Sequence, residues 1–238
     1  MRGTTQFFDT QGERFLTLYS EKACFQDRLG LFINSVKSAI APPGSVLDFG
    51  CGPGVISLEL GRIGYNVFGV DASNGMIEAA RANLMRYRLP NVHYEIAANV
   101  DWSIQEGAFC GVICSSVLEY IEDDWNLLKM LTGTLRLGGM IAISVPHREG
   151  IVGLVEHMLC HWQTYRRRQG SSHLKFSLRR YSRGQLSAYC KKLGISELRF
   201  TTFEFPIFGR TGNTLSRCRL LSGMLFVTGR KTSFGDLE

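Results

Sequence analysis

The sequence has 238 residues, 45% of them hydrophobic, and a formal net charge of +6. This length and composition suit one folded α/β domain and argue against a disordered chain. No stretch approaches the roughly 20 apolar residues of a membrane span, and the first residues, MRGTTQFFDTQGERF, lack the apolar core of a signal peptide. The seven cysteines include no C-x-x-C pair, which favours reduced thiols and a cytoplasmic protein.

The predicted elements follow one another in a regular order. Residues 7–40 are expected to be helical, and the run Ala41-Pro42-Pro43-Gly44 ends that helix. Strands are then expected at 45–49, 66–70, 91–97, 111–116 and 139–145, with helices at 54–63, 74–88 and 122–136. A further helix over 150–168 interrupts this alternation, and a helix near 182–193 and strands at 196–205 and 223–230 finish the chain. The alternation predicts a parallel sheet with helices on both faces.

The first strand leads into a glycine-rich turn, VLDFGCGPGV, with the carboxylate of Asp48 at its entrance. A phosphate-binding P-loop would need G-K-[ST] after its glycines, and that element does not occur here. A dinucleotide site needs Gly or Ala where Val55 stands, and Pro53 removes one of the N–H donors that such a site uses. Asp48 would repel a pyrophosphate but attract a cation. The turn therefore favours a positively charged nucleoside such as S-adenosylmethionine.

A second carboxylate supports this interpretation. Asp71 ends the second predicted strand, 21 positions after Gly50. At the end of a parallel strand, such a side chain can accept hydrogen bonds from both ribose hydroxyls.

Three segments taken together resemble the class I S-adenosylmethionine-dependent methyltransferases: VLDFGCGPG, VFGVDAS and FCGVICSSVLEYIEDDWNLLKMLTGTLRLGGMIAISVP. In addition, SRGQLSAYCKKLGI resembles the helix before strand six in quinone-type O-methyltransferases. The resemblance implies an α/β, Rossmann-like, seven-stranded sheet with the last strand antiparallel and helices on both faces. The long connection that interrupts the alternation is expected to form a helical cap insertion. These expectations divide the chain into an N-terminal helical lid (1–40), a cofactor-binding core (41–149), the cap insertion (150–183) and the C-terminal part of the core sheet (184–238).

The resemblance also implies which residues bind the cofactor. After the third strand the family carries an acid that bonds the adenine amino group, but this chain has Ala98 there, with Asn99 beside it. The side-chain oxygen of Asn99 can accept one hydrogen bond in place of the acid. The expected cofactor contacts are Asp48, Gly50, Cys51, Gly52, Asp71, Ala72, Ala98, Asn99, Ser115 and Tyr19.

Three residues are candidates for the methyl-transfer step, each with a structural alternative. His147 follows the fifth strand at the edge where open α/β sheets bind ligands, and a solvated loop histidine is the alternative. Tyr120 stands where the family often has His, as a pocket wall or a base. His161 lies on one helix face with His157 and Cys160, which suits packing or a substrate contact better than a metal, so no metal is expected.

One basic segment carries the positive charge. The forty residues between Glu156 and Glu197 contain nine Lys and Arg and no acid. Three interpretations remain open: a solvated surface, recognition of an anionic small molecule or a membrane surface, and nucleic-acid binding. The fourth strand ends in CSSVLEY without the [DN]-P-P-[YF] element of base-amino methyltransferases, which argues against nucleic acid.

We therefore predict methylation of a small molecule, most simply O-methylation of an aromatic, natural-product or lipid-like acceptor. Two long connections, 150–183 and 206–220, are expected to overhang the ligand site. Their aromatic and cationic residues favour an acceptor with an apolar body and a negative group; they include Trp162, Tyr165, Arg166, Arg167, Arg168 and Arg210. The alternatives are an RNA or protein methyltransferase and a non-catalytic binding module. The aromatic N-terminal residues Phe7, Phe8 and Tyr19 are expected to cover the cofactor or to pack in the core.

Overall fold

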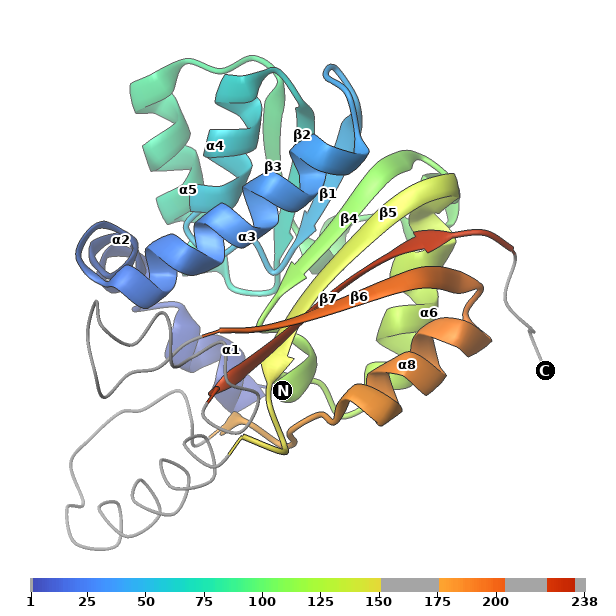
Figure 1. Cartoon of the computed structure of the whole chain (residues 1–238). Coiled ribbons are helices and arrows are strands. Elements are labelled where there is room, and N and C mark those ends of the chain that lie inside the picture. The colour runs from blue at the N-terminus through green and yellow to red at the C-terminus, as the bar shows by residue number, and fades with distance from the viewer. Residues whose placement is uncertain (1, 151–175, 204–221, 234–238) are drawn as a thin grey trace, which may run out of the picture.

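The computed structural model describes residues 2–150, 176–203 and 222–233, whose strands form one sheet between two layers of helices (Figure 1). Most of the predicted cap insertion, and with it the helix expected over 150–168, lies outside the described residues.

The sheet has seven strands in the order β3-β2-β1-β4-β5-β7-β6. Strand β7 pairs antiparallel with both β5 and β6, whereas all pairs among β1 to β5 are parallel. The predicted seven-stranded sheet with its last strand antiparallel is confirmed. The strands are β1 (Ser45–Phe49), β2 (Asn66–Asp71), β3 (Val92–Ile96), β4 (Phe109–Ser115), β5 (Leu135–Pro146), β6 (Ile195–Phe203) and β7 (Met224–Lys231).

Helices cover both faces of this sheet, as the alternation predicted. On one face α3 (Ala23–Ala39), α4 (Val55–Ile63) and α5 (Asn74–Tyr87) contribute to one apolar cluster with the sheet. On the other, α6 (Asp124–Thr134) and α8 (Arg183–Lys192) contribute to a second. Successive side chains of β1 point to opposite faces of the sheet, so Val46 belongs to the first cluster and Leu47 to the second.

The N-terminal region forms three helices rather than the single helix expected over 7–40: α1 (Arg2–Phe8), α2 (Gly12–Glu21) and α3. The chain turns after α1, where the Gln11 backbone N–H donates to Phe8 O over 2.9 Å. Gly12 is buried against α5, and a Cβ at this position would lie 2.7 Å from the Cβ of Ala79. The lack of a side chain at Gly12 therefore lets α2 pack closely on α5.

Among the described residues, no helix combines the length and the apolar character needed to cross a membrane.

Candidate functional site

The glycine-rich turn between β1 and α4 is held in a conformation that favours glycine. Gly50, Gly52 and Gly54 have φ values of 75°, 53° and 79°, all in the left-handed region. The backbone N–H groups of Gly50 and Cys51 donate to Val70 O over 2.7 and 3.0 Å, which fixes the turn to the end of β2. A Cβ on Gly50 would collide with the side chain of Val117.

Asp48 lies fully inside the protein at the start of this turn. One carboxylate oxygen, Oδ2, accepts a hydrogen bond from Ser57 Oγ over 2.6 Å. The other, Oδ1, is buried and has no hydrogen-bond partner among the described residues. Burial raises the pKa of Asp48 to about 7 against the opposing Ser57 hydrogen bond, and the nearby charge of Asp71 raises it further. A buried acceptor left unsatisfied is costly, so Oδ1 is available to a hydrogen-bond donor from a ligand.

Asp71 joins the glycine turn to the start of α5. Its Oδ2 accepts from the Gly52 N–H and its Oδ1 from the Ser73 N–H, both over 2.9 Å. Burial raises the pKa of Asp71, while these backbone hydrogen bonds act in the opposite direction. A backbone hydrogen bond from Ala72 acts in the same direction. A carboxylate has about four acceptor sites, so Asp71 can still accept a hydrogen bond from a ligand.

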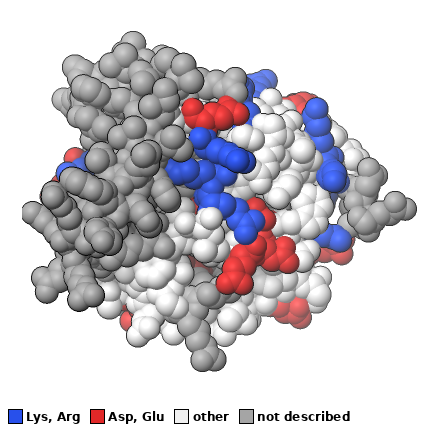
Figure 2. Space-filling model, turned by 90° about the horizontal axis from the view of Figure 1, so that it is seen from below, with Lys and Arg blue, Asp and Glu red and all other residues white. Residues whose placement is uncertain are grey.

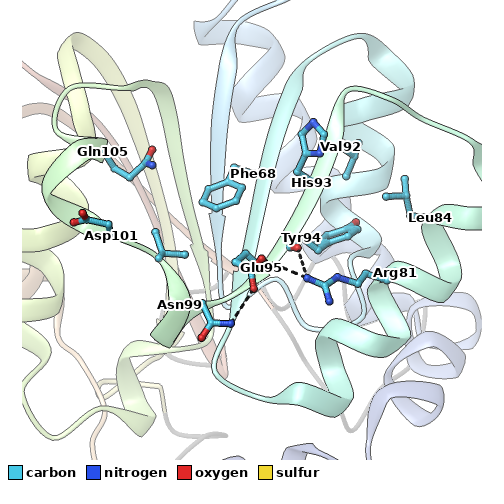
Figure 3. A pocket seen from close by; sticks show the side chains of 11 residues that line it. Phe68, Arg81, Leu84, Val92, His93, Tyr94, Glu95, Asn99, Asp101 and Gln105 are labelled. Carbon is cyan, nitrogen blue, oxygen red and sulfur yellow. Dashed lines mark hydrogen bonds and ion pairs between the residues drawn. The ribbon is translucent and has the colours of Figure 1, made fainter.

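The end of β3 lies beside Asp71, because Ile96 pairs with Asp71 in the sheet. The 3₁₀ turn η1 (Ala97–Asn99) follows and exposes Ala98 and Asn99, and Ala72 is exposed after β2. Next to η1, a cavity of about 530 Å³ opens between α5 and the 3₁₀ segment η2 (Trp102–Gln105) (Figure 3). The cavity borders Asn99, but neither Asp48 nor Asp71 lines it.

Two serines, Ser115 and Ser116, lie at the end of β4. Of these, only Ser115 was predicted from the sequence as a cofactor contact. Ser115 Oγ lies 3.4 Å from Ser144 Oγ. Ser116 has a φ of 55°, uncommon for a residue with a side chain, and its buried Oγ has no hydrogen-bond partner in the part of the chain that the structure describes. No pattern in the sequence distinguishes Ser116 from its neighbours.

Aromatic residues of the N-terminal helices pack beside η3 (Leu118–Tyr120), which follows β4. The rings of Phe8 and Tyr120 meet edge to face with centroids 5.5 Å apart. The ring centroids of Phe7 and Phe176 are 5.2 Å apart. Tyr19 is half-buried on α2, and its ring centroid lies 5.0 Å from that of Phe25.

His147 is fully buried just after β5. Its Nδ1 is 3.0 Å from Ser222 Oγ, and its Nε2 is 3.7 Å from Glu149 Oε2. The solvated loop alternative for His147 is therefore wrong. His161 lies outside the described residues.

The N-terminal chain also reaches the start of α5 through Asp9, which the sequence did not suggest. Asp9 Oδ1 accepts from Ser73 Oγ over 2.7 Å and from the Gly75 N–H over 3.3 Å. A Cβ on Gly75 would collide with Asp9 O. Ser73 is thus shared between Asp9 and Asp71.

Acidic and basic side chains lie side by side on the face of the molecule shown in Figure 2. From the basic segment, Arg179 Nη1 forms an ion pair with Asp124 Oδ1 over 2.7 Å. The guanidinium carbon of Arg183 lies 4.9 Å from the ring centroid of Phe200. In the described ranges, no three His, Cys, Asp or Glu side chains are grouped as a metal site.

Comparison with known proteins gives a consistent result. A family model described as a methyltransferase domain matches residues 23–196. The chain is 29% identical over 104 residues to the ubiquinone biosynthesis O-methyltransferase of Albidiferax ferrireducens, covering 43% of this chain and 41% of that protein. Against the protein of that name from Xanthomonas campestris it is 28% identical over 118 residues, 49% of each chain. The matches thus span less than half the length of these relatives.

Solved structures share the whole fold at low sequence identity. The magnesium protoporphyrin IX methyltransferase of Synechocystis has a TM-score of 0.70 at 15% identity, over 95% of this chain and 97% of that one. The 1,6-didemethyltoxoflavin-N1-methyltransferase of Burkholderia thailandensis has a TM-score of 0.66 at 16% identity, over 96% and 87% of the two chains.

Proposed function

The chain belongs to the methyltransferase-domain family as a class I S-adenosylmethionine-dependent methyltransferase, and we propose that it methylates an oxygen atom of a small aromatic, natural-product or lipid-like acceptor. The relatives named for ubiquinone biosynthesis support a small acceptor and O-methylation.

The observation that carries the proposal is the buried Asp48 carboxylate beside the glycine turn. Its Oδ1, without a hydrogen-bond partner among the described residues, suits the ammonium group of S-adenosylmethionine. In this proposal Asp71 accepts hydrogen bonds from the ribose hydroxyls, and Asn99 accepts one from the adenine amino group. The remaining predicted contacts are Gly50, Cys51, Gly52, Ala72, Ala98, Ser115 and Tyr19. The bound cofactor supplies an electrophilic methyl carbon on a sulfonium; the residues that hold it need no covalent part in the reaction.

The acceptor side is proposed to lie where the N-terminal helices meet η3. There the contact between Phe8 and Tyr120 closes an apolar wall that excludes water from the reacting groups. Residues 1–40 then act as a lid. Tyr120, His147 and His161 are the candidates to receive the acceptor proton, and His147 can do so only if the acceptor reaches its buried ring.

We also propose that the acceptor carries a negative group, because the chain clusters Arg166, Arg167 and Arg168 next to Trp162 and Tyr165. Replacing the three arginines together by glutamine should raise the acceptor KM and leave S-adenosylmethionine affinity unchanged. The same basic segment suits contact with a membrane surface. The scattered cysteines favour a cytoplasmic location.

The test is binding followed by turnover. Isothermal titration should show one S-adenosylhomocysteine bound per chain, and labelled methyl groups should pass from S-adenosylmethionine to a panel of phenols and hydroxylated lipids. No binding at millimolar S-adenosylhomocysteine overturns the proposal. Binding with transfer only to RNA or protein, and with strongly salt-dependent RNA retention, would favour a macromolecular acceptor instead.

A further inference from the structure

Glu95, near the end of β3, holds the side chain of Asn99 through a hydrogen bond. Asn99 Nδ2 donates to Glu95 Oε1 over 3.2 Å, and the Ile96 N–H donates to the same oxygen over 2.8 Å. On the other side, Glu95 Oε2 lies 3.5 Å from an Arg81 guanidinium nitrogen, which also donates to Tyr94 O over 2.9 Å. Glu95 therefore has three partners, and Figure 3 shows its contacts with Asn99 and Arg81.

The charge of Glu95 decides which way the amide of Asn99 faces. An ionised carboxylate only accepts hydrogen bonds, so it must meet the NH₂ end of the amide and not the oxygen. The backbone hydrogen bond from Ile96 and the one from Asn99 lower the pKa of Glu95, which keeps it ionised at neutral pH. Figure 3 shows the Asn99 nitrogen turned toward Glu95 and the oxygen turned away.

The free end of the amide is therefore an acceptor, and Asn99 lies in the 3₁₀ turn that follows β3, the strand that ends opposite Asp71. Asn99 follows Ile96 by three positions, and Ile96 pairs with Asp71 across the sheet. A hydrogen-bond acceptor here matches a 6-amino purine, whose exocyclic nitrogen donates. It opposes a 6-oxo purine, whose exocyclic oxygen would face another oxygen.

We propose that Glu95 is a positioning residue that locks the Asn99 amide with its oxygen toward the purine, which makes the site selective for adenosyl over inosyl cofactors. The inference rests on the proposed function, because it concerns the same site. It explains how the chain reads adenine with Ala98 in the position of the usual acid.

The experiment compares the dissociation constants of S-adenosylhomocysteine and its 6-oxo analogue, S-inosylhomocysteine. The native protein should prefer the adenosyl ligand by at least about fivefold, the value expected for one lost hydrogen bond with an unpaired acceptor. Asn99→Ala and Glu95→Ala should both bring the preference close to one. Glu95→Gln, which keeps size and packing, should lower it, because a glutamine can present either end to Asn99. Asp101→Asn is the matched control: Asp101 lines the same cavity but bonds Ser103, so this variant should keep the native preference.

Exchanging the carboxylate of Glu95 and the amide of Asn99 tests their roles most directly. Asn99→Asp alone sets two carboxylates against each other and should weaken both ligands. Combined with Glu95→Gln, it restores an amide next to a carboxylate and should recover adenosyl selectivity, which a merely structural role of Glu95 would not produce. If Glu95→Ala and Glu95→Gln bind S-adenosylhomocysteine with the native preference, the inference is wrong while the proposed function stands. If the native protein binds neither ligand, both fail.

Discussion

Asp9 and Ser73 are joined by a 2.7 Å hydrogen bond although 64 positions separate them in the sequence. Ser73 also caps α5, because its Oγ accepts from the Met76 N–H, and its own N–H donates to Asp71. The turn between α1 and α2 is thus connected through one residue to the carboxylate proposed to hold the ribose. Closure of the N-terminal helices and binding of the cofactor should therefore depend on each other.

Replacing Asp9 by alanine should weaken S-adenosylhomocysteine binding by about three- to tenfold, the scale of one or two hydrogen bonds at an exposed position. Calorimetric titration measures the effect. Glu13→Ala, which removes an exposed carboxylate from the next helix, should bind like the native protein. If the Asp9 variant binds S-adenosylhomocysteine with native affinity, the contact between Asp9 and Ser73 does not affect cofactor binding.

Asp71→Ala should weaken S-adenosylhomocysteine by about 1.5–3 kcal/mol, because charge-assisted hydrogen bonds to the ribose are lost. Gly52 and Ser73 also lose the acceptor of their backbone N–H groups. Glu78→Ala, on the exposed side of α5, controls for the change in net charge. A loss below twofold at Asp71 would place the ribose elsewhere.

Asp48 should make the protein less stable as the pH rises. Its folded-state pKa of about 7 lies above its ordinary value of 3.8, so between these pH values the folded state binds a proton that the unfolded state has released. The free energy of unfolding then falls across this window, by up to about 4 kcal/mol from this one group. Asp71, whose pKa is also raised, adds a slope of the same sign.

Asp48→Asn removes the first contribution. Urea unfolding at pH 5 and pH 8 should show that the variant loses less stability with rising pH than the native protein. The same variant should bind S-adenosylmethionine more weakly, because the carboxylate facing the ammonium group is gone. If the stability of the two proteins depends on pH in the same way, folding does not raise the pKa of Asp48, and this prediction is wrong.

Lys231→Met should destabilise the fold by about 1–3 kcal/mol without changing cofactor affinity. The buried ammonium group donates to Thr132 O and Leu135 O over 2.8 Å each, and so caps the end of α6. Burial lowers the pKa of Lys231, so native stability should rise with pH between this lowered pKa and the unfolded value, and the variant should lack that rise. Thermal unfolding measures both, with the exposed Lys192→Met as control.

The sequence predicts the sheet well because its signals are local. Strands β1, β2 and β4 are short apolar runs bounded by turn residues. The N-terminal region was predicted less well. Neither Pro nor a strong turn dipeptide marks the break after Phe8, and the turn there is stabilised by the contact of Asp9 with α5, which lies far away in sequence.

The same distinction applies to the site. Asp48, Gly50 and Asp71 belong to motifs whose spacing is visible in the sequence, and the structure places them around one turn. Glu95 and Ser116 did not stand out. The role of Glu95 depends on which neighbour its carboxylate meets, and that of Ser116 on a backbone angle, and neither is encoded in a short pattern.

Strand β3 is the last strand on its side of the sheet, so one side of its backbone faces away from β2. Arg81 donates to Tyr94 O there, and the Glu95 carboxylate accepts from the Ile96 N–H. A strand from another molecule would have to displace these charged side chains before it could pair with β3. Such blocking of an open sheet edge is how proteins resist aggregation at high concentration, and an Arg81→Ala variant that aggregates sooner would reveal it here.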